Sequence, residues 1–131
     1  MSLTDEERRV MVELEIERAD KIMQQVPLFV DNCLWDTLAN RLYYAAYHAV
    51  MALLINSGIH VGTHKGAIIM FNKEFVRKGV FTAEEGYLFS NMERLRESGD
   101  YNCFIDTCET EIVPYIEPVS KLINKIKEIV L

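Results

Sequence analysis

The segment from Asn32 to Asn56 constrains the fold most, because apolar residues fall on nearly every side of the helix that it would form. Its most apolar window, Leu42 to Ile55, is 14 residues long and contains His48. A helix that spans a bilayer needs about 20 apolar residues, so this window predicts a buried helix instead. Such a helix must be covered on nearly all sides. We therefore expect a central helix that its own bundle covers on one side and that a second subunit could cover on the other.

The two sides of this predicted helix differ in character. One side is lined by apolar residues, namely Trp35, Leu42, Ala46, Val50 and Leu53. The opposite side carries Arg41 and His48 among Ala45, Met51, Ala52 and Ile55. The alanines on this side are small enough to let another helix approach closely.

The rest of the chain also has the pattern of helices. Glycine and proline are scarce, with 6 and 3 residues among 131, and apolar residues recur at spacings of three and four. A half-hydrophobic chain of 131 residues has the size of one domain with one core. We therefore predict an all-α fold, an up-and-down bundle of four to five helices, in a single domain over residues 1–131.

Capping and breaking residues set the expected helix boundaries. Thr4 and Thr82 each precede a glutamate by three residues, which predicts two capping boxes, and Thr63 is a further N-cap candidate. The first helix is expected to end before Pro27. The expected helices cover residues 4–25, 32–56, 63–76, 82–99 and about 104–130.

The last of these segments contains two breaking residues. Its apolar residues follow a regular four-three spacing at Ile112, Ile116, Val119, Ile123, Ile126 and Val130. Pro114 and Pro118 each remove a backbone donor. The helix is therefore expected to kink there or to divide in two.

Charge and cysteine content limit the possible partners and compartment. The net charge of −6 argues against broad attraction to a polyanion, so any nucleic-acid contact must use a local cluster. The charged N-terminus has no apolar run of the kind a secretory signal needs, so we expect a cytoplasmic protein with no membrane contact.

Cys33, Cys103 and Cys108 lack metal-ligand spacing and are expected to be reduced packing thiols. We expect no metal and no cofactor.

Arg41 and His48 are the strongest candidates for chemistry. Seven positions apart, they return to one stripe of a helix, roughly 10 Å apart along its axis. A guanidinium offers a planar fork of donors for phosphate oxygens, and an imidazole can exchange a proton near neutral pH. This pair suits cleavage of RNA, where the 2′-hydroxyl is the nucleophile and no metal is obligatory. In the alternative interpretation, Arg41 pairs with an acidic residue and His48 is a hydrogen-bonded core residue.

Polar neighbours favour the functional interpretation. Asn40, Tyr44 and Tyr47 project from one flank of the same stripe. Their amide and phenol groups could hold a sugar or phosphate, and the rings could stack on bases. Tyr43 points away from the stripe and is expected to pack in the core.

Two further groups of residues lie outside this helix. Arg96 could border the same cleft and bind substrate, together with Arg94, Asp100 and Tyr101; in a structural role it would pair with Asp100. His64 lies beside Lys65 near a helix start, where capping or packing is expected.

The residues around Arg41 resemble a known family. The pattern Asn40-Arg41-x-Tyr43-Tyr44-Ala45-x-x-His48-Ala49, followed by Leu53-Leu54 and Gly58, is similar to that of the HEPN superfamily, in particular its small stand-alone bacterial and archaeal members. The similarity covers about residues 30–130 and continues through His64-Lys65-Gly66, Phe71-Asn72-Lys73, Phe75-Val76, Leu95-Arg96 and Gly99-Asp100-Tyr101.

The resemblance implies a fold, an activity and partners. It implies a bundle of four or five helices that dimerises around the helix with the arginine and histidine, so that two motifs form one composite cleft. It also implies metal-independent ribonuclease activity, with Arg41 and His48 as the catalytic pair and Asn40 as the polar residue beside the arginine. Many such proteins resemble toxins encoded beside a minimal nucleotidyltransferase that acts as antitoxin.

Two other hypotheses stay open. Many ribonuclease members place the polar residue after the arginine, whereas Asn40 precedes Arg41. A noncatalytic module that binds a nucleotide or a nucleotidyltransferase is therefore the second hypothesis. In the third, Arg41 and His48 only fix the register of a helical dimer.

Overall fold

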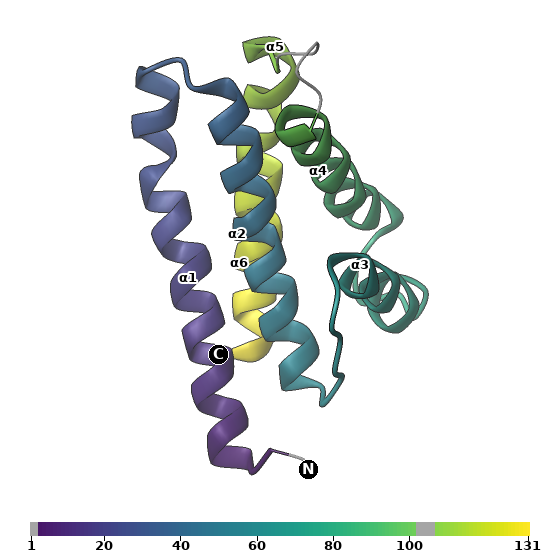
Figure 1. Cartoon of the computed structure of the whole chain (residues 1–131). Coiled ribbons are helices and arrows are strands. Elements are labelled where there is room, and N and C mark those ends of the chain that lie inside the picture. Colours follow the sequence, from purple (N-terminus) through teal and green to yellow (C-terminus); the bar gives the residue numbers. More distant parts are fainter. Residues whose placement is uncertain (1–2, 102–106) are drawn as a thin grey trace.

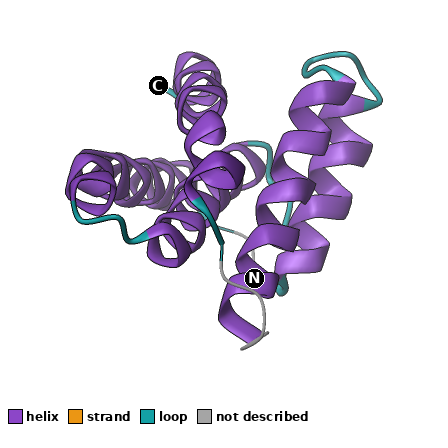
Figure 2. Ribbon diagram, turned by 90° about the horizontal axis from the view of Figure 1, so that it is seen from above, coloured by secondary structure: helices purple, strands orange, loops and turns teal. Residues whose placement is uncertain are grey.

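The computed structural model describes residues 3–101 and 107–131, with side chains at all of these positions except 99–101. Every regular element in these ranges is helical, which confirms the predicted all-α fold (Figure 2). In chain order the elements are α1 (Asp5–Asp31), α2 (Trp35–Asn56), α3 (His64–Phe71), the π-helical turn η1 (Asn72–Val76), α4 (Ala83–Tyr101), α5 (Glu109–Ile112), the 3-10 turn η2 (Val113–Tyr115) and α6 (Ile116–Val130).

Helix α2 lies at the centre of the bundle, as predicted. It runs antiparallel to α1, with α6 on its far side and α3 and α4 along its remaining flank (Figure 1). Its fully buried residues lie on several sides of the helix: Leu38, Ala39, Leu42, Tyr43, Ala45, Ala46, Ala49, Val50, Ala52, Leu53 and Leu54. The alanines beside the polar stripe are therefore already covered within one chain.

Helix α1 begins as expected and ends later than expected. The capping box of Thr4 and Glu7 is present, with Thr4 N donating to Glu7 Oε1 at 2.9 Å. The predicted end near Gln25 was wrong, because the helix continues through Pro27 to Asp31. Pro27 has no backbone N–H, so one helical hydrogen bond is lost, and its ring lies on the exposed side of the helix. Residues on the other side, Val26, Phe29 and Val30, pack against the core and outweigh that loss.

The turn between α1 and α2 explains the later start of α2. Asn32, predicted to begin the second helix, is instead the C-cap of α1. Cys33 follows with a φ of 54°, in the left-handed region, which no right-handed helix contains. The second helix therefore begins at Trp35 rather than near residue 32.

The chain between α2 and α4 follows the predicted caps and contains an unpredicted π turn. Thr63 caps α3, with Gly66 N donating to its Oγ1 at 2.8 Å. The helix continues into η1 through Val76, and Gly79 ends the segment with a φ of 80°. The second capping box is also present, with Glu85 N donating to Thr82 Oγ1 at 3.1 Å.

The end of the fourth helix and the last segment differ partly from prediction. Helix α4 extends to Tyr101, two residues beyond the expected end, while the expected start near Phe104 lies outside the described residues. The last segment divides at Pro114, where η2 separates α5 from α6. Pro118 is tolerated in the first turn of α6, where its missing donor has no helical partner. The predicted apolar seam is confirmed, with Ile116 half-buried and Ile112, Val119, Ile123, Ile126 and Val130 buried.

The cysteines do not pack in the core where they are described. Cys33 and Cys108 are free and exposed, so the expectation of packing thiols was wrong for both, and Cys103 lies outside the described residues. Cys108 instead precedes α5, where its backbone amide donates to Glu111 at 3.3 Å. Among the described helices, none is both long enough and apolar enough to cross a bilayer.

Candidate functional site

The candidate site is built on one stripe of α2. Arg41, Tyr44 and His48 follow one another at spacings of three and four, so they lie on the same side of the helix. The guanidinium carbon of Arg41 lies 5.5 Å from the centre of the Tyr44 ring, and the rings of Tyr44 and His48 are 6.5 Å apart. Tyr44 therefore lies between the cation and the imidazole, and all three side chains are half-buried.

The guanidinium of Arg41 contacts an aromatic ring. It lies over the face of the Tyr44 ring, and it forms no salt bridge with any side chain that the structure describes in residues 3–98 and 107–131. The alternative interpretation of Arg41 as half of an ion pair is therefore not met in the described part of the chain. A half-buried guanidinium without a carboxylate partner is suited to receive an anion from outside.

His48 is held by a carboxylate from α1. Its Nδ1 atom lies 2.7 Å from Oε2 of Glu15, and the two side chains are 20% and 15% exposed. An ionised carboxylate only accepts hydrogen bonds, so this contact places a proton on Nδ1 and leaves Nε2 as the atom that gains and loses a proton. The other oxygen of Glu15 accepts from Arg18 at 2.8 Å.

Glu15 was not among the residues predicted for the site. A signal was present, because Glu15 lies on α1 beside the buried positions Val12, Ile16 and Ala19. A carboxylate next to the apolar side of an amphipathic helix is close to the core and needs a partner there.

Tyr47 and His64 extend the site toward α3. The ring of Tyr47 lies 5.5 Å from His48 and 4.5 Å from His64, while Tyr44 lies 5.6 Å from His64. His64 was expected to cap the helix or to pack, but Thr63 forms the cap. The packing of α3 on α2 brings His64 into contact with the tyrosines, a tertiary relationship for which the local sequence has no signal.

Buried side chains pack against these rings on the side that faces the core. Tyr43 is 0% exposed and packs as predicted, and its hydroxyl lies 2.8 Å from Nδ1 of His64. Burial is the main reason that the pKa of Tyr43 is raised, and the carboxylate of Glu93 adds to the rise. Phe89 of α4 stacks on the same ring.

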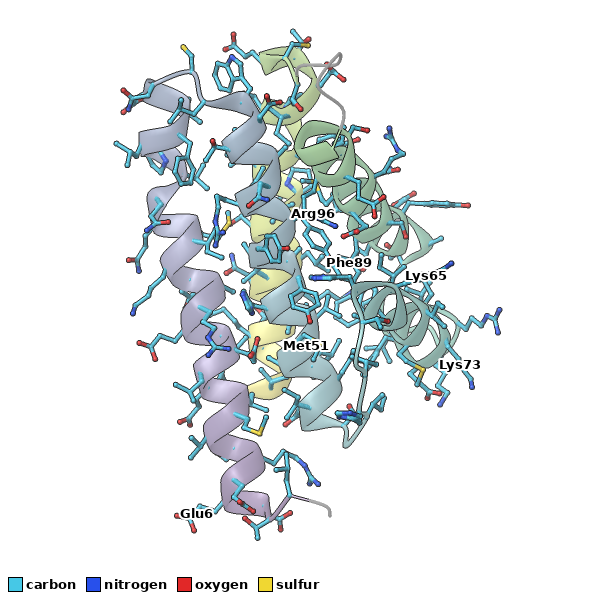
Figure 3. The ribbon with its side chains drawn as sticks, in the orientation of Figure 1. Glu6, Met51, Lys65, Lys73, Phe89 and Arg96 are labelled. Atoms are coloured by element: carbon cyan, nitrogen blue, oxygen red, sulfur yellow. The ribbon has the colours of Figure 1, made fainter. Side chains whose placement is uncertain are left out.

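Arg96 is also one of these buried side chains. It is 6% exposed, and its guanidinium carbon lies 5.2 Å from the ring centre of Tyr43 and 5.8 Å from that of Tyr44. Its Nη2 donates to Glu93 Oε1 at 2.6 Å. Figure 3 shows Arg96 and Phe89 on the side of α4 that faces α2. Arg96 was predicted to bind substrate, whereas in the structure it is buried and packs against the rings of Tyr43 and Tyr44.

The remaining predicted residues lie around or outside the stripe. Asn40 is half-buried next to Arg41. Arg94 is exposed and lines a separate groove of about 810 Å³ between α4 and the α5–α6 segment. The side chains of Asp100 and Tyr101 lie outside the described part of the structure, so the expected pairing of Asp100 with Arg96 stays a prediction.

The assembled site combines three chemical capacities. Arg41 can bind an anion, His48 can transfer a proton at Nε2, and the half-buried rings of Tyr44 and Tyr47 can stack on a planar group. Such a combination suits a phosphodiester with attached bases.

Comparisons with known proteins agree with the fold and the motif. The model of the HEPN domain matches residues 12–130. A Thermotoga maritima protein named "UPF0332 protein" is 27% identical over 124 residues, which cover 95% of this chain and 94% of the relative. A Methanocaldococcus jannaschii protein named "Putative toxin MJ0142" is 28% identical over 130 residues, which cover 98% of this chain and 88% of the relative. The chain belongs to the HEPN domain family.

Proposed function

We propose that this protein is a metal-independent RNA endonuclease of the HEPN type that acts as a homodimer and as the toxin of a toxin–antitoxin pair. The observation that carries the proposal is the stripe on α2, where Arg41, without a carboxylate partner among the described residues, shares Tyr44 as a neighbour with His48. The toxin name of the M. jannaschii relative supports the biological role.

The reaction is an internal transesterification of RNA. Nε2 of His48 accepts the proton of the 2′-hydroxyl, and Glu15 stabilises the imidazolium that forms. The 2′-oxygen bonds to phosphorus, and the bond from phosphorus to the 5′-oxygen breaks. Arg41 donates hydrogen bonds to the phosphate oxygens while the crowded phosphorane forms. The products carry a 2′,3′-cyclic phosphate and, after protonation of the leaving oxygen, a 5′-hydroxyl.

The need for a local positive cluster favours a homodimer. The chain has a net charge of −6, so RNA must be held by a local positive cluster. One chain offers a single Arg41 on the stripe, and two chains joined near α2 would offer two. Apolar side chains lie near the stripe: Met11 of α1 lines a groove with half-buried Met51 and Ile55 of α2, and Val10 and Leu14 are exposed on α1. Burial of these side chains would stabilise the pairing.

The expected antitoxin is a minimal nucleotidyltransferase. This expectation comes from the resemblance to HEPN toxins and is compatible with a half-exposed site that a partner protein could cover. Coexpression with the product of an adjacent nucleotidyltransferase gene, followed by affinity purification, tests for a complex. Toxicity of the chain alone that coexpression relieves would support the pairing.

RNA cleavage is the direct test. Purified protein should cut a mixed-sequence RNA in EDTA and leave cyclic phosphate and 5′-hydroxyl ends, identified by mass spectrometry. His48→Ala should lower the rate by about 10²–10⁴-fold, because it removes the proton acceptor. Arg41→Ala should lower it by about 10²–10³-fold, because it removes donors to the transition-state phosphate.

Matched controls separate catalysis from folding and assembly. His60→Ala and Arg77→Ala change exposed residues of the same types and should keep the wild-type rate. Melting temperature and light scattering should show the variants folded and dimeric. If His48→Ala and Arg41→Ala cut RNA as fast as the controls, the catalytic assignment is wrong; if they lose the dimer, the two residues fix its register instead.

A noncatalytic nucleotide-binding module is the second candidate. The half-buried rings of Tyr44 and Tyr47 favour it, because they can stack on a base whether or not the phosphate is cleaved. Calorimetry with an oligonucleotide that lacks 2′-hydroxyls would then show binding that Tyr44→Ala weakens, while RNA stays intact.

A further inference from the structure

His64 lies within the same ring cluster as His48, although it comes from a different helix. Both imidazoles contact Tyr44 and Tyr47, at ring distances of 6.5 and 5.5 Å for His48 and 5.6 and 4.5 Å for His64. His64 is half-buried, whereas its neighbour Lys65 points away from α2 (Figure 3). The two histidines therefore flank the same pair of tyrosines.

The buried hydroxyl of Tyr43 orients His64. It lies 2.8 Å from Nδ1 of the imidazole. A protonated imidazole carries a hydrogen on both of its nitrogens, and neither of them can then accept a hydrogen bond. The phenol oxygen then accepts from Nδ1–H of His64. As in His48, the atom left to exchange a proton is Nε2.

We propose that His64 is the general acid of the RNA cleavage reaction. This inference rests on the proposed function and adds the group that the stripe on α2 lacks. The reaction takes a proton from the 2′-oxygen and gives one to the departing 5′-oxygen, and two imidazoles can divide these two roles. His48, bound directly to a carboxylate, is the better acceptor. Protonated His64 transfers its Nε2 proton to the 5′-oxygen as the bond from phosphorus breaks, and it regains a proton from His48 through water after each turnover.

The test uses a substrate that does not need an acid. An oligoribonucleotide with sulfur in place of the bridging 5′-oxygen at the mapped cleavage site releases a thiolate, which leaves without protonation. His64→Ala should cut ordinary RNA about 10²-fold or more slowly than wild type and cut the sulfur substrate at nearly the wild-type rate. His48→Ala should be slow on both substrates, because the base is still required. His64→Gln, which retains a polar side chain, should repeat the result of His64→Ala.

Controls assign each failure to one proposal. His60→Ala replaces an exposed histidine four residues earlier and should match wild type on both substrates. Wild-type protein that cuts no RNA would overturn the proposed function together with this inference. Wild-type cleavage with an unchanged rate in the folded His64 variants would overturn the inference alone. An equal loss of rate on the two substrates in the His64 variants would also overturn the inference, because a structural role of His64 would slow the cleavage of both.

Discussion

Nδ1 of His48 and Oε2 of Glu15 lie 2.7 Å apart and join α2 to α1. Both side chains are largely buried, so the contact is weakly screened by solvent. It fixes the orientation of the imidazole and directs proton exchange to Nε2. Glu15 of α1 thereby determines which nitrogen of His48 on α2 is available for proton transfer.

Glu15→Gln should reduce RNA cleavage by about tenfold or more, because an amide can offer Nδ1 either a donor or an acceptor and no longer stabilises the imidazolium. Single-turnover rates at fixed pH measure this loss. Glu13→Gln, which changes an exposed carboxylate on the same helix, should have the wild-type rate. Full activity of Glu15→Gln would show that the contact has no part in the reaction.

Arg41→Lys tests whether the planar fork matters beyond its charge. Lysine keeps the positive charge but loses the paired donors and the stacking on Tyr44. Cleavage should fall by about tenfold or more, while RNA affinity should stay within a few-fold of wild type. Filter binding at fixed salt and single-turnover rates separate the two quantities, with Arg77→Lys as the exposed control. A lysine variant as fast as wild type would contradict phosphate recognition by the fork.

Local sequence signals predicted much of the fold. Thr4, Thr63 and Thr82 act as caps because each bonds within four residues, which sequence can reveal. The helix end at Pro27 was mispredicted, because burial of the neighbouring Val26 comes from contacts with distant segments. Sequence predicted either a kink or a division at Pro114, because local signals do not show how the two halves of the segment pack on the rest of the bundle.

The site was only partly predictable. Arg41, Tyr44 and His48 share one helix, so their spacing alone places them on one side. Glu15 and His64 reach the site through packing of α1 and α3 on α2, and that packing determines which polar residues meet. Arg96 was expected either to border the cleft or to have a structural role at the end of its helix, and the structure buries it against aromatic rings and Glu93.

Gly86→Ala should destabilise the protein, although alanine normally favours a helix interior by about 1 kcal/mol. A Cβ at Gly86 would lie 2.5 Å from Asn72 Oδ1 and 3.1 Å from Val76 Cγ2. Asn72 cannot yield freely, because its Nδ2 donates to the Ile68 carbonyl at 2.9 Å. Overpacking costs about 1–3 kcal/mol, so a net loss is expected in urea unfolding. The loss should shrink when Asn72→Ala is also present; a variant more stable than wild type would contradict the predicted clash.

Glu85 should make stability depend on pH in the acid range. Burial raises the pKa of its carboxyl, but the Thr82 amide and the Lys125 ammonium outweigh burial and hold that pKa below 4.5. A carboxyl whose pKa is lower in the folded state than in the unfolded state stabilises the folded protein at any pH above the unfolded-state pKa. This stabilisation disappears as the pH falls through the folded-state pKa.

Glu85→Gln should therefore lower the free energy of unfolding by about 1 kcal/mol at neutral pH, since it weakens the capping box and removes the ion pair. The difference from wild type should narrow steadily as the pH falls below 4.5, where the wild-type carboxyl becomes protonated. Urea unfolding between neutral pH and the acid limit measures both proteins. Glu84→Gln, an exposed neighbour in the same helical turn, should give a smaller difference with little change in this range. A difference between wild type and Glu85→Gln that stays constant with pH would contradict the assignment, because protonation would then not be linked to folding at this position.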